Sequence, residues 1–408
     1  MGINKDSQKA PILRFKGFTD DWEQRKLSSM TMYKNGKSHE DKQSTSGKYE
    51  LINLNSISIS GGLKHSGKFI EDTDDTLQKD DLVMILSDIG HGDLLGRVAL
   101  IPNDNMFVLN QRVALLRPNE TADPHFLFSY INAHQYYFKS QGAGMSQLNI
   151  SKGSVENFTS NVPTIQEQNY IGSFLKQINN IIALHQRKLD QLNQLKEALL
   201  QQMFPVKGET VPKLRFAGFE GDWEERKLGE LSNIVGGGTP STSNPEYWDG
   251  DIDWYAPAEI GEQSYVSKSK KTITELGLKK SSARILPVGT VLFTSRAGIG
   301  NTAILAKDAT TNQGFQSIVP DKKKLDSYFI FSRTNELKRY GEVTGAGSTF
   351  VEVSGKQMSK MPIKVPVLSE QQRIGTFFKS LDDTITLQQR KLDQLKNTKQ
   401  VLLQNMFI

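Results

Sequence analysis

Residues 11–27 read PILRFKGFTDDWEQRKL, and residues 212–228 read PKLRFAGFEGDWEERKL. Twelve of these seventeen positions are identical, at a constant offset of 201. A second block follows the same rule, because residues 163–205 align with residues 366–408 at an offset of 203. Self-similarity at a fixed period is the signature of a repeated structural unit. The chain is therefore two copies of one unit, and each copy is long enough to bury its own core.

The composition limits the classes of protein to which the chain can belong. It has 408 residues, a net charge of +5 and no cysteine. The lack of cysteine excludes disulfides and thiolate metal sites and fits a reducing compartment. No apolar run reaches the roughly 18 residues of a membrane helix, and the polar N-terminus lacks the apolar core of a signal peptide. We expect a cytoplasmic protein without a membrane partner, and the mild positive charge slightly favours a polyanionic partner.

Each copy begins with a globular stretch of mixed secondary structure. Strand-like runs such as LVMIL (82–86) and TVLFTS (290–295) alternate with Gly, Asn and Asp turns. One helix is predicted in each copy, at residues 125–138 and 327–340, and Asp123 is placed to cap the first. Because the strands follow one another closely, without crossover helices between them, the predicted fold class is α+β with antiparallel or mixed sheet.

A long amphipathic helix closes each copy. Apolar residues recur at heptad spacing over 171–203 and 374–406, which predicts a coiled coil. Polar residues break both seams at equivalent places, namely His185, Lys196, Gln388 and Lys399. Facing residues of an antiparallel pair have a constant sum of residue numbers, and the pairs His185–Lys399 and Lys196–Gln388 share one sum. A buried polar layer commonly fixes register, so we predict an intramolecular antiparallel coiled coil in which these residues meet. In the alternative, each helix packs only on its own globular body.

These patterns give two similar domains separated by two long helices, related by a pseudo-twofold. The expected boundaries are 1–162 for the first globular domain, 163–205 for the central helix, 206–365 for the second globular domain and 366–408 for the C-terminal helix. The globular bodies agree far less than their flanks, and identity shrinks to islands such as Asn110-Gln111 against Asn312-Gln313. Divergent bodies on a shared scaffold indicate two different specificities, although faster drift of loops would give the same pattern.

The sequence contains no complete catalytic or metal-binding motif. The run GLKHSGKF (62–69) stops one residue short of a phosphate-binding loop, and Phe69 stands where a hydroxyl would hold magnesium. The run GIGNTA (298–303) is followed by a strand, whereas a dinucleotide fingerprint opens a helix. The histidines lack metal-ligand spacing, and no HExxH or GxSxG occurs. We expect no catalytic residue, no metal site and no cofactor on this chain.

With these residues in view, the chain resembles the specificity subunits of type I restriction–modification systems. The resemblance covers nearly the whole length and rests first on the doubled stretch PxLRFxGFxxxWExxKL. It rests also on GGGTPSTSNPEYWDGDIDWYAP (236–257) and on EQxxI after a proline, at Glu167–Ile171 and Glu370–Ile374. The first globular domain lacks this segment and has TMYKNGKSHEDKQSTSGKYELINLNSI (31–57) as its counterpart, so it is expected to be a recognition domain of another type.

The resemblance implies that each globular domain is a target recognition domain for one half of an asymmetric, bipartite DNA target. The helices would set the spacer between the half-sites and dock two methyltransferase subunits. Restriction/translocase subunits would join the full complex. S-adenosylmethionine would be bound by the methyltransferase partners, and this chain would be non-catalytic. The main alternative is a two-headed adaptor that binds proteins or glycans; an enzyme with an unrecognised site is a third reading.

Base reading needs donor and acceptor side chains on exposed loops, whereas phosphate contacts need Lys, Arg or small hydroxyl residues. In the first domain the candidate DNA-binding residues are Lys34, Asn35, Lys37, Ser87, His91, Gln141, Ser146 and Gln147. In the second they are Thr239, Ser241, Lys268, Lys270, Lys271, Ser295, Arg296, Ser348 and Thr349. For each, the alternative is a solvated loop residue without a role. Trp22 and Trp223 belong to the repeated stretch and are expected in the core.

Overall fold

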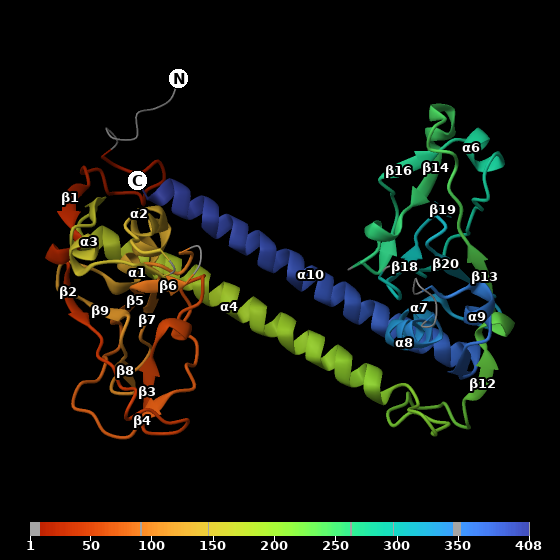
Figure 1. Cartoon of the computed structure of the whole chain (residues 1–408), viewed down its shortest axis with the longest axis horizontal. Coiled ribbons are helices and arrows are strands. Elements are labelled where there is room, and N and C mark those ends of the chain that lie inside the picture. Colours follow the sequence, from red (N-terminus) through yellow and green to blue (C-terminus); the bar gives the residue numbers. More distant parts are fainter. Residues whose placement is uncertain are drawn as a thin grey trace. The chain divides into compact units, whose positions relative to one another are not determined.

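The computed structural model describes residues 9–89, 92–145, 147–261, 263–296, 298–345 and 352–407. The chain folds into two compact units. The first unit is Met1–Gln186 with Arg390–Ile408, and the second is Arg187–Gln389. Both mix helices with sheets (Figure 1), so the predicted α+β class is confirmed. The first unit is discontinuous in sequence, because it includes the end of the C-terminal helix.

A four-stranded antiparallel sheet forms the centre of the first unit, in the order β2 (Thr31–Asn35), β9 (Val113–Pro118), β5 (Leu82–Ile85) and β7 (Val98–Leu100). Strand β5 is buried throughout, with Leu82 and Met84 in one hydrophobic cluster and Val83 and Ile85 in another. Because both faces of the strand are covered, its sequence is a continuous apolar run without alternation.

Smaller sheets complete the first unit. A three-stranded sheet contains β4 (Phe69–Ile70), β3 (Tyr49–Ile52) and β8 (Phe107–Leu109), of which β3 and β8 are parallel. The two-stranded sheets pair β1 (Glu23–Lys26) with β11 (Thr159–Val162), and β6 (Ser87–Ile89) with β10 (Gln147–Asn149). The mixture of parallel and antiparallel pairs agrees with the sheet type expected from the sequence.

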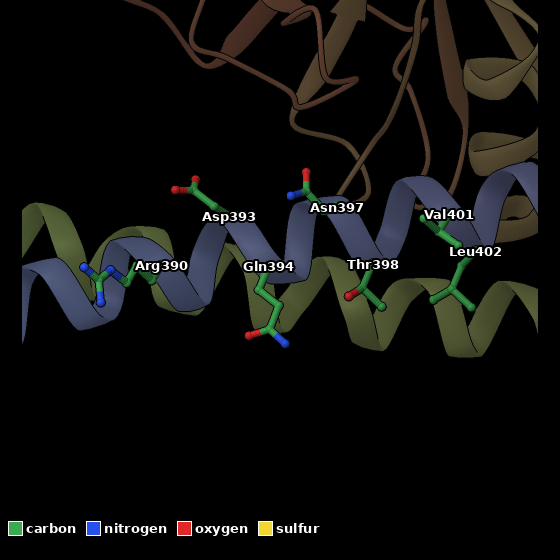
Figure 2. Close-up of a pocket in the computed structure, with 7 residues that line it drawn as sticks. All are labelled: Arg390, Asp393, Gln394, Asn397, Thr398, Val401 and Leu402. Atoms are coloured by element: carbon green, nitrogen blue, oxygen red, sulfur yellow. The ribbon is translucent and has the colours of Figure 1, made fainter. Parts of the chain in front are cut away.

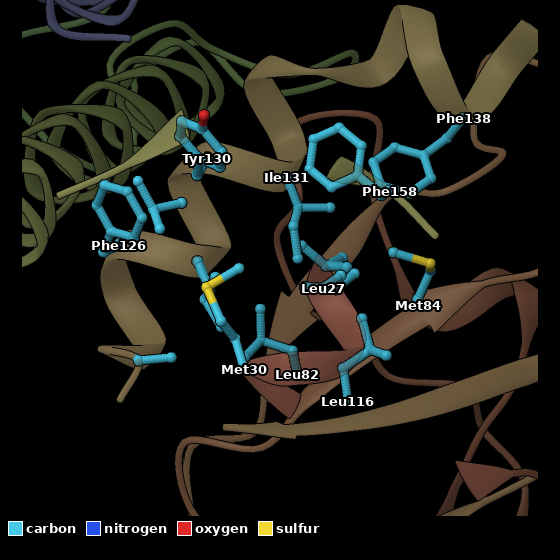
Figure 3. Close-up of a cluster of buried hydrophobic side chains, with 14 of the residues drawn as sticks. Leu27, Met30, Leu82, Met84, Leu116, Phe126, Tyr130, Ile131, Phe138 and Phe158 are labelled. Atoms are coloured by element: carbon cyan, nitrogen blue, oxygen red, sulfur yellow. The ribbon is translucent and has the colours of Figure 1, made fainter. Parts of the chain in front are cut away.

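The single helix expected over 125–138 is wrong, because the structure has two helices there. Helix α1 (Pro124–Ala133) ends at His134, which has φ −97° and ψ 32°, and α2 (Gln135–Ser140) begins directly after it. Both helices bury aromatic residues of one cluster, including Phe126 and Phe138 (Figure 3). The cap is as predicted, since the Asp123 carboxylate accepts a hydrogen bond from the Phe126 N–H at 2.7 Å. The short α3 (Lys152–Glu156) follows β10.

The second unit repeats this plan with a larger sheet. Its five strands are, in order, β13 (Ser232–Gly236), β20 (Gln316–Pro320), β17 (Val291–Phe293), β18 (Thr302–Leu305) and β15 (Tyr265–Val266). A three-stranded sheet contains β16 (Lys271–Ile273), β14 (Trp248–Tyr255) and β19 (Thr310–Thr311), and β12 (Glu224–Lys227) pairs with β21 (Pro362–Val365). The helices are α5 (Leu228–Leu231), α6 (Glu275–Lys279), α7 (Ser327–Phe331), α8 (Thr334–Gly345) and α9 (Gly355–Ser359). The helix expected over 327–340 is likewise divided, between α7 and α8.

Two long helices, α4 (Ile165–Gln202) and α10 (Leu368–Met406), follow the globular parts. The predicted seam positions are buried or half-buried along both helices, whereas residues on other faces, such as Leu184, are exposed. In the first unit, Lys396 lies 3.5 Å from Gln186, and Met406 belongs to one cluster with Leu175. Residue numbers therefore rise on one helix as they fall on the other. The two segments are antiparallel, as the sequence predicts.

The second unit shows the same antiparallel pairing and adds a buried carboxylate to it. The Lys196 ammonium lies 2.5 Å from Asp382, which also accepts a hydrogen bond from the Tyr328 hydroxyl at 2.8 Å. The predicted register has Lys196 facing Gln388, less than two turns farther along α10. A lysine side chain can extend along a helix to reach a carboxylate, so this ion pair does not define the level of the two backbones. The register remains a prediction.

The repeated sequence motifs form one clamp in each unit. In the first, the Arg14 guanidinium makes two hydrogen bonds, of 2.7 and 2.8 Å, to the fully buried Glu167 carboxylate. In the second, Arg215 binds the equally buried Glu370 at 2.8 and 2.7 Å. In each copy, the arginine of the repeated stretch (11–27 or 212–228) is thereby fixed to the first turn of the long helix. This contact explains why the arginine and the glutamate of the EQxxI motif occur in both copies. Trp22 and Trp223 are 3% and 2% exposed, so their predicted core position is confirmed.

Each core is completed by the end of a long helix that the other copy supplies. Phe407 packs edge-on against Tyr130, with 5.0 Å between ring centroids. Phe204, at the equivalent position of the first copy, lies 5.6 Å from Phe329 in the second unit. The backbone repeats the arrangement: the Leu13 N–H donates to the Asn405 carbonyl at 2.8 Å, and Leu214 to Gln202 at 2.9 Å.

Candidate nucleic-acid interface

Three segments of the first unit meet at one end of its four-stranded sheet. They are the end of β2 with Gly36, the turn Asn110–Arg112 before β9, and Leu86 between β5 and β6. The Gly36 N–H donates to the Val113 carbonyl at 2.9 Å, and the Leu86 N–H donates to the Arg112 carbonyl at 3.0 Å. Several predicted DNA-binding residues lie on these segments or beside them.

The Asn-Gln turn of the first unit is held by close packing and by its own side chain. A Cβ atom on Gly36 would lie 1.8 Å from the Asn110 carbonyl oxygen, so only glycine fits there. The Asn110 side chain accepts a hydrogen bond from the Gln111 N–H at 2.9 Å. The next residue, Arg112, has φ 65°. The close packing and the hydrogen bond therefore hold the backbone of this turn, and with it the positions from which its side chains project.

The second unit contains a similar glycine-locked turn, although Gly314 does not have the positive φ of Arg112. A Cβ atom on Gly237 would lie 1.9 Å from the Asn312 carbonyl oxygen, and the Asn312 side chain accepts from the Gly314 N–H at 2.7 Å. The Ser295 N–H donates to the Gly314 carbonyl at 2.8 Å. The Asn-Gln islands that survive in both copies therefore mark one structural device, at which a glycine of the preceding segment locks a turn.

These matched hydrogen bonds identify equivalent positions in the two units. The Ile150 N–H donates to the Leu86 carbonyl, and the Val353 N–H donates to the Ser295 carbonyl. The neighbouring residues carry the paired side chains. Ser87 follows Leu86 and donates a hydrogen bond to Asn149, which precedes Ile150, at 2.7 Å. Arg296 follows Ser295 and donates to Glu352, which precedes Val353, at 3.0 Å. The same place in the fold thus carries a neutral hydrogen-bonded pair in one unit and an ion pair in the other.

The remaining candidates of the first unit lie around this end of the sheet or on α2. Lys34 forms an ion pair with Asp75 at 2.5 Å, and Asn35 accepts a hydrogen bond from the Tyr33 hydroxyl at 2.6 Å. Lys37 is exposed and forms a β-bridge with Asn110. Gln147 donates to Ser87, whereas Gln141 is exposed at the end of α2. His91 and Ser146 lie outside the described residues.

The candidates of the second unit divide between two places. Thr239 donates to Gln313 of the locked turn, and Ser241 shares a hydrogen bond of 2.9 Å with Ser243. Lys268 and Lys270 are exposed between β15 and β16, and Lys271 on β16 lies over the ring of Trp248 at 5.5 Å. Ser348 and Thr349 lie outside the described residues.

Two expectations about exposure are wrong. Ser87 and Ser295 were expected on exposed loops, but they are 2% and 0% exposed. Ser87 follows β5 and Ser295 follows β17, which are both buried strands inside a sheet. The chain remains buried or half-buried for two residues after each strand ends. The Ser295 hydroxyl makes no hydrogen bond to any described residue. Ser87 acts through its contacts with Asn149 and Gln147, and direct reading by Ser295 would require the backbone to move.

Sequence reasoning missed three residues of this region, namely Arg112, Asn149 and Glu352. Arg112 carried a usable signal, because the aligned islands read Asn-Gln-Arg in one copy and Asn-Gln-Gly in the other. Asn149 and Glu352 carried none, since they differ in type and are identified only through the matched hydrogen bonds.

The acidic residue Asp253, on β14 of the second unit's three-stranded sheet, has a structural role. The Asp253 carboxylate lies 2.5 Å from the Lys307 ammonium and accepts two hydrogen bonds from Ser269. Burial alone would raise the pKa of Asp253, but the hydrogen bonds from Lys307 and Ser269 outweigh it and lower that pKa. Burial raises the pKa of the neighbouring Tyr255 to about 12. Among the described residues, no group of three or more His, Cys, Asp or Glu side chains could hold a metal ion.

A shallow groove of about 570 Å³ follows α10 in the first unit (Figure 2). Its lining residues are Arg390, Asp393, Gln394, Asn397, Thr398, Val401 and Leu402. Two of these residues, Val401 and Leu402, are apolar, and Val401 is 56% exposed. No helix in the described part of the chain has the length and apolar character to cross a membrane.

Comparison with known proteins agrees with this geometry. The family described as "Type I restriction modification DNA specificity domain" matches residues 19–194 and 220–397, which is more than half of the chain. Each match contains one of the locked Asn-Gln turns. Each match also begins within one copy of the repeated stretch, at 11–27 or at 212–228. The two copies found in the sequence are therefore two domains of one family.

Individual relatives carry the same family name. The chain is 24% identical over 404 residues to the "Putative type I restriction enzyme MjaX specificity subunit" of Methanocaldococcus jannaschii, covering 94% of this chain and 92% of the relative. It is 37% identical over 190 residues to the MjaIX specificity subunit of the same organism. That match covers 46% of this chain and 44% of the relative, so the chain spans less than half of that relative's length.

The fold has a close counterpart among solved structures. The S subunit of a type I restriction-modification system from M. genitalium has a TM-score of 0.69 at 17% identity, covering 98% of this chain and 99% of that one. At this identity the likeness establishes the fold alone. Together with the two domain matches, it leads to one conclusion: the chain belongs to the type I restriction modification DNA specificity family.

Proposed function

We propose that this chain is the DNA-sequence specificity subunit of a type I restriction–modification complex, and that each unit reads one half of an asymmetric, bipartite target. One observation carries the proposal. The two units share a locked turn and a backbone frame, yet equivalent positions hold Ser87–Asn149 in one and Arg296–Glu352 in the other. A frame that is kept while its polar pair changes is suited to reading two different sequences.

The two pairs suit different bases. A guanidinium can donate two hydrogen bonds to O6 and N7 of guanine, and a glutamate can accept from N4 of cytosine. Serine is permissive, whereas asparagine suits adenine. The lysines Lys37, Lys268 and Lys270 are exposed, and in this proposal they would contact phosphates, which position a protein on DNA without reading its sequence.

The long helices supply the remaining part of the proposed role. They would set the spacer between half-sites and dock two methyltransferase subunits, with the α10 groove around Val401 as one docking surface. S-adenosylmethionine would be carried by those partners, and restriction/translocase subunits would join the complete assembly. The chain itself would contribute recognition and no catalysis.

The test is to map methylated bases in DNA from cells that contain this chain with its methyltransferase partner. A bipartite motif with a fixed spacer is expected. Arg296→Ala should abolish or relax one half of the motif and leave the other half intact. Methylation at a continuous motif, or an equal change in both halves, would contradict the division of recognition between the units.

A further inference from the structure

Arg112 has a backbone conformation that side chains rarely adopt. Its φ of 65° lies in the left-handed region, where glycine is at ease and a bulky residue is strained. In the second unit, the residue after the Asn-Gln pair is Gly314, which does not have a positive φ, so the strained backbone is particular to the first unit. Strained residues persist where the surrounding structure over-determines them, and they cluster at functional sites. A bulky, charged residue held in this conformation calls for a role of its side chain.

The surroundings fix the backbone of Arg112 on both sides. Its carbonyl accepts a hydrogen bond from Leu86 at 3.0 Å, and the preceding turn is tied by the Asn110 side chain and by Gly36. Asn110 is itself only 8% exposed. An arginine on such a backbone loses less freedom on binding than one on a loose loop, so more of the interaction energy is available to the ligand.

The charge of Arg112 is not used within the described part of the molecule. Its side chain is exposed, and it makes no ion pair or side-chain hydrogen bond with the described residues. The Glu40 carboxylate nearby accepts a hydrogen bond from the Gln111 amide at 2.7 Å. Arg296, by contrast, has Glu352 as a partner at 3.0 Å. Lys37 adds a second exposed cation at the same turn, through its bridge to Asn110.

We propose that Arg112 is a phosphate contact of the first unit with DNA. The planar guanidinium offers paired donors that match two phosphate oxygens. A phosphate is the ligand that this surface fits, because a second exposed cation, Lys37, lies at the same turn, and neighbouring cations suit the polyanionic backbone of DNA. The inference rests on the proposed function of the chain in DNA recognition.

The test uses the full chain with its methyltransferase partner, a mixed-sequence duplex and a duplex that contains the mapped target. Arg112→Gly removes the charge and also relieves the strained backbone. We expect the affinity for both duplexes to fall by about tenfold at low salt. The slope of log K against log salt should become shallower by about 0.9, the value for one lost phosphate contact. The melting temperature should stay the same or rise, because glycine adopts this φ without strain.

Two control variants make the result specific. Arg112→Lys keeps the positive charge and should retain the salt slope. Lys79→Ala removes an exposed cation that precedes β5, at the opposite end of that strand from Leu86, and should change neither affinity nor slope.

Three outcomes would overturn the proposal. A folded Arg112→Gly chain with unchanged affinity and slope would show that the side chain does not meet DNA. A loss restricted to the mapped target, with mixed-sequence binding intact, would show that Arg112 reads a base. If the unaltered complex binds neither duplex, the proposed function fails and this assignment fails with it, and that outcome is recognised before any variant is compared.

Discussion

Arg296 and Glu352 form an ion pair with 3.0 Å between Nε and Oε1, at the position where Ser87 and Asn149 share a hydrogen bond in the first unit. The Arg296 side chain is 48% exposed, so its guanidinium can reach a ligand while the carboxylate orients it. A surface pair of this kind contributes little to stability. Its value lies in fixing the direction of a planar donor.

Replacing Arg296 should therefore affect recognition and leave folding almost unchanged. Arg296→Ala is expected to weaken discrimination at the second half-site by roughly 1–3 kcal/mol, the usual worth of a bidentate base contact. Methylation assays on targets altered in one half at a time measure this loss. Arg339→Ala removes an exposed arginine of α8 and serves as the matched control. Equal losses at both half-sites would contradict the assignment.

Removing one partner of the clamp between Arg215 and Glu370 should strongly destabilise the second unit. Glu370 is fully buried, so Glu370→Gln leaves the guanidinium without its carboxylate and should reduce the free energy of unfolding by about 2–4 kcal/mol. Urea unfolding followed by circular dichroism measures the change. The double variant Arg215→Met/Glu370→Met should lose less than the single variant, because no unpaired charge remains buried. A loss in the double variant equal to the sum of the losses in the two single variants would argue against a coupled pair.

Lys399 should lower stability, and the effect should depend on pH. Burial lowers the pKa of its ammonium group below the ordinary 10.5 of lysine. The unfolded chain therefore binds this proton more tightly, and the free energy of unfolding should rise with pH between the lowered value and 10.5. Lys399→Met should raise stability by roughly 1 kcal/mol at neutral pH, and the gain should shrink as the pH approaches the ordinary pKa of lysine.

Lys196, the equivalent residue of the first copy, gives a matched control for this prediction. Its ammonium is paired with the buried Asp382, so Lys196→Met should decrease stability by leaving that carboxylate without its partner. Thermal unfolding of the two variants across the pH range compares them directly. A gain from both replacements would show that the two lysines have the same environment.

Phe407 and Phe204 should each stabilise the unit whose core they enter. Phe407→Ala should reduce the free energy of unfolding of the first unit by about 2–4 kcal/mol, and Phe204→Ala that of the second. Hydrogen exchange resolved by peptide can assign each loss to a unit. As a control, Val401→Ala truncates an exposed apolar residue of α10 and should change the free energy of unfolding of either unit very little. Loss of protection in the wrong unit would contradict the packing.

Most of the fold could be predicted from the sequence, but less of the candidate site could be, and particular residues show the physical reasons. The repeats, the heptad seams and the buried Trp22 follow from periodicity, because burial selects residue type over many positions. The break at His134 was missed, since the apolar period continues through it while the backbone does not. The burial of Ser295 and the left-handed Arg112 depend on neighbouring segments, such as Gly36, that no local pattern identifies.

The contact of Phe407 with Tyr130 has a consequence for synthesis on the ribosome. The first unit needs Arg390–Ile408, which are made after every residue of the second unit through Gln389. The unit that begins first therefore cannot finish folding before the whole second unit has been synthesised. Its incomplete apolar core must stay open, or be shielded by a chaperone, while about half of the chain is still being synthesised.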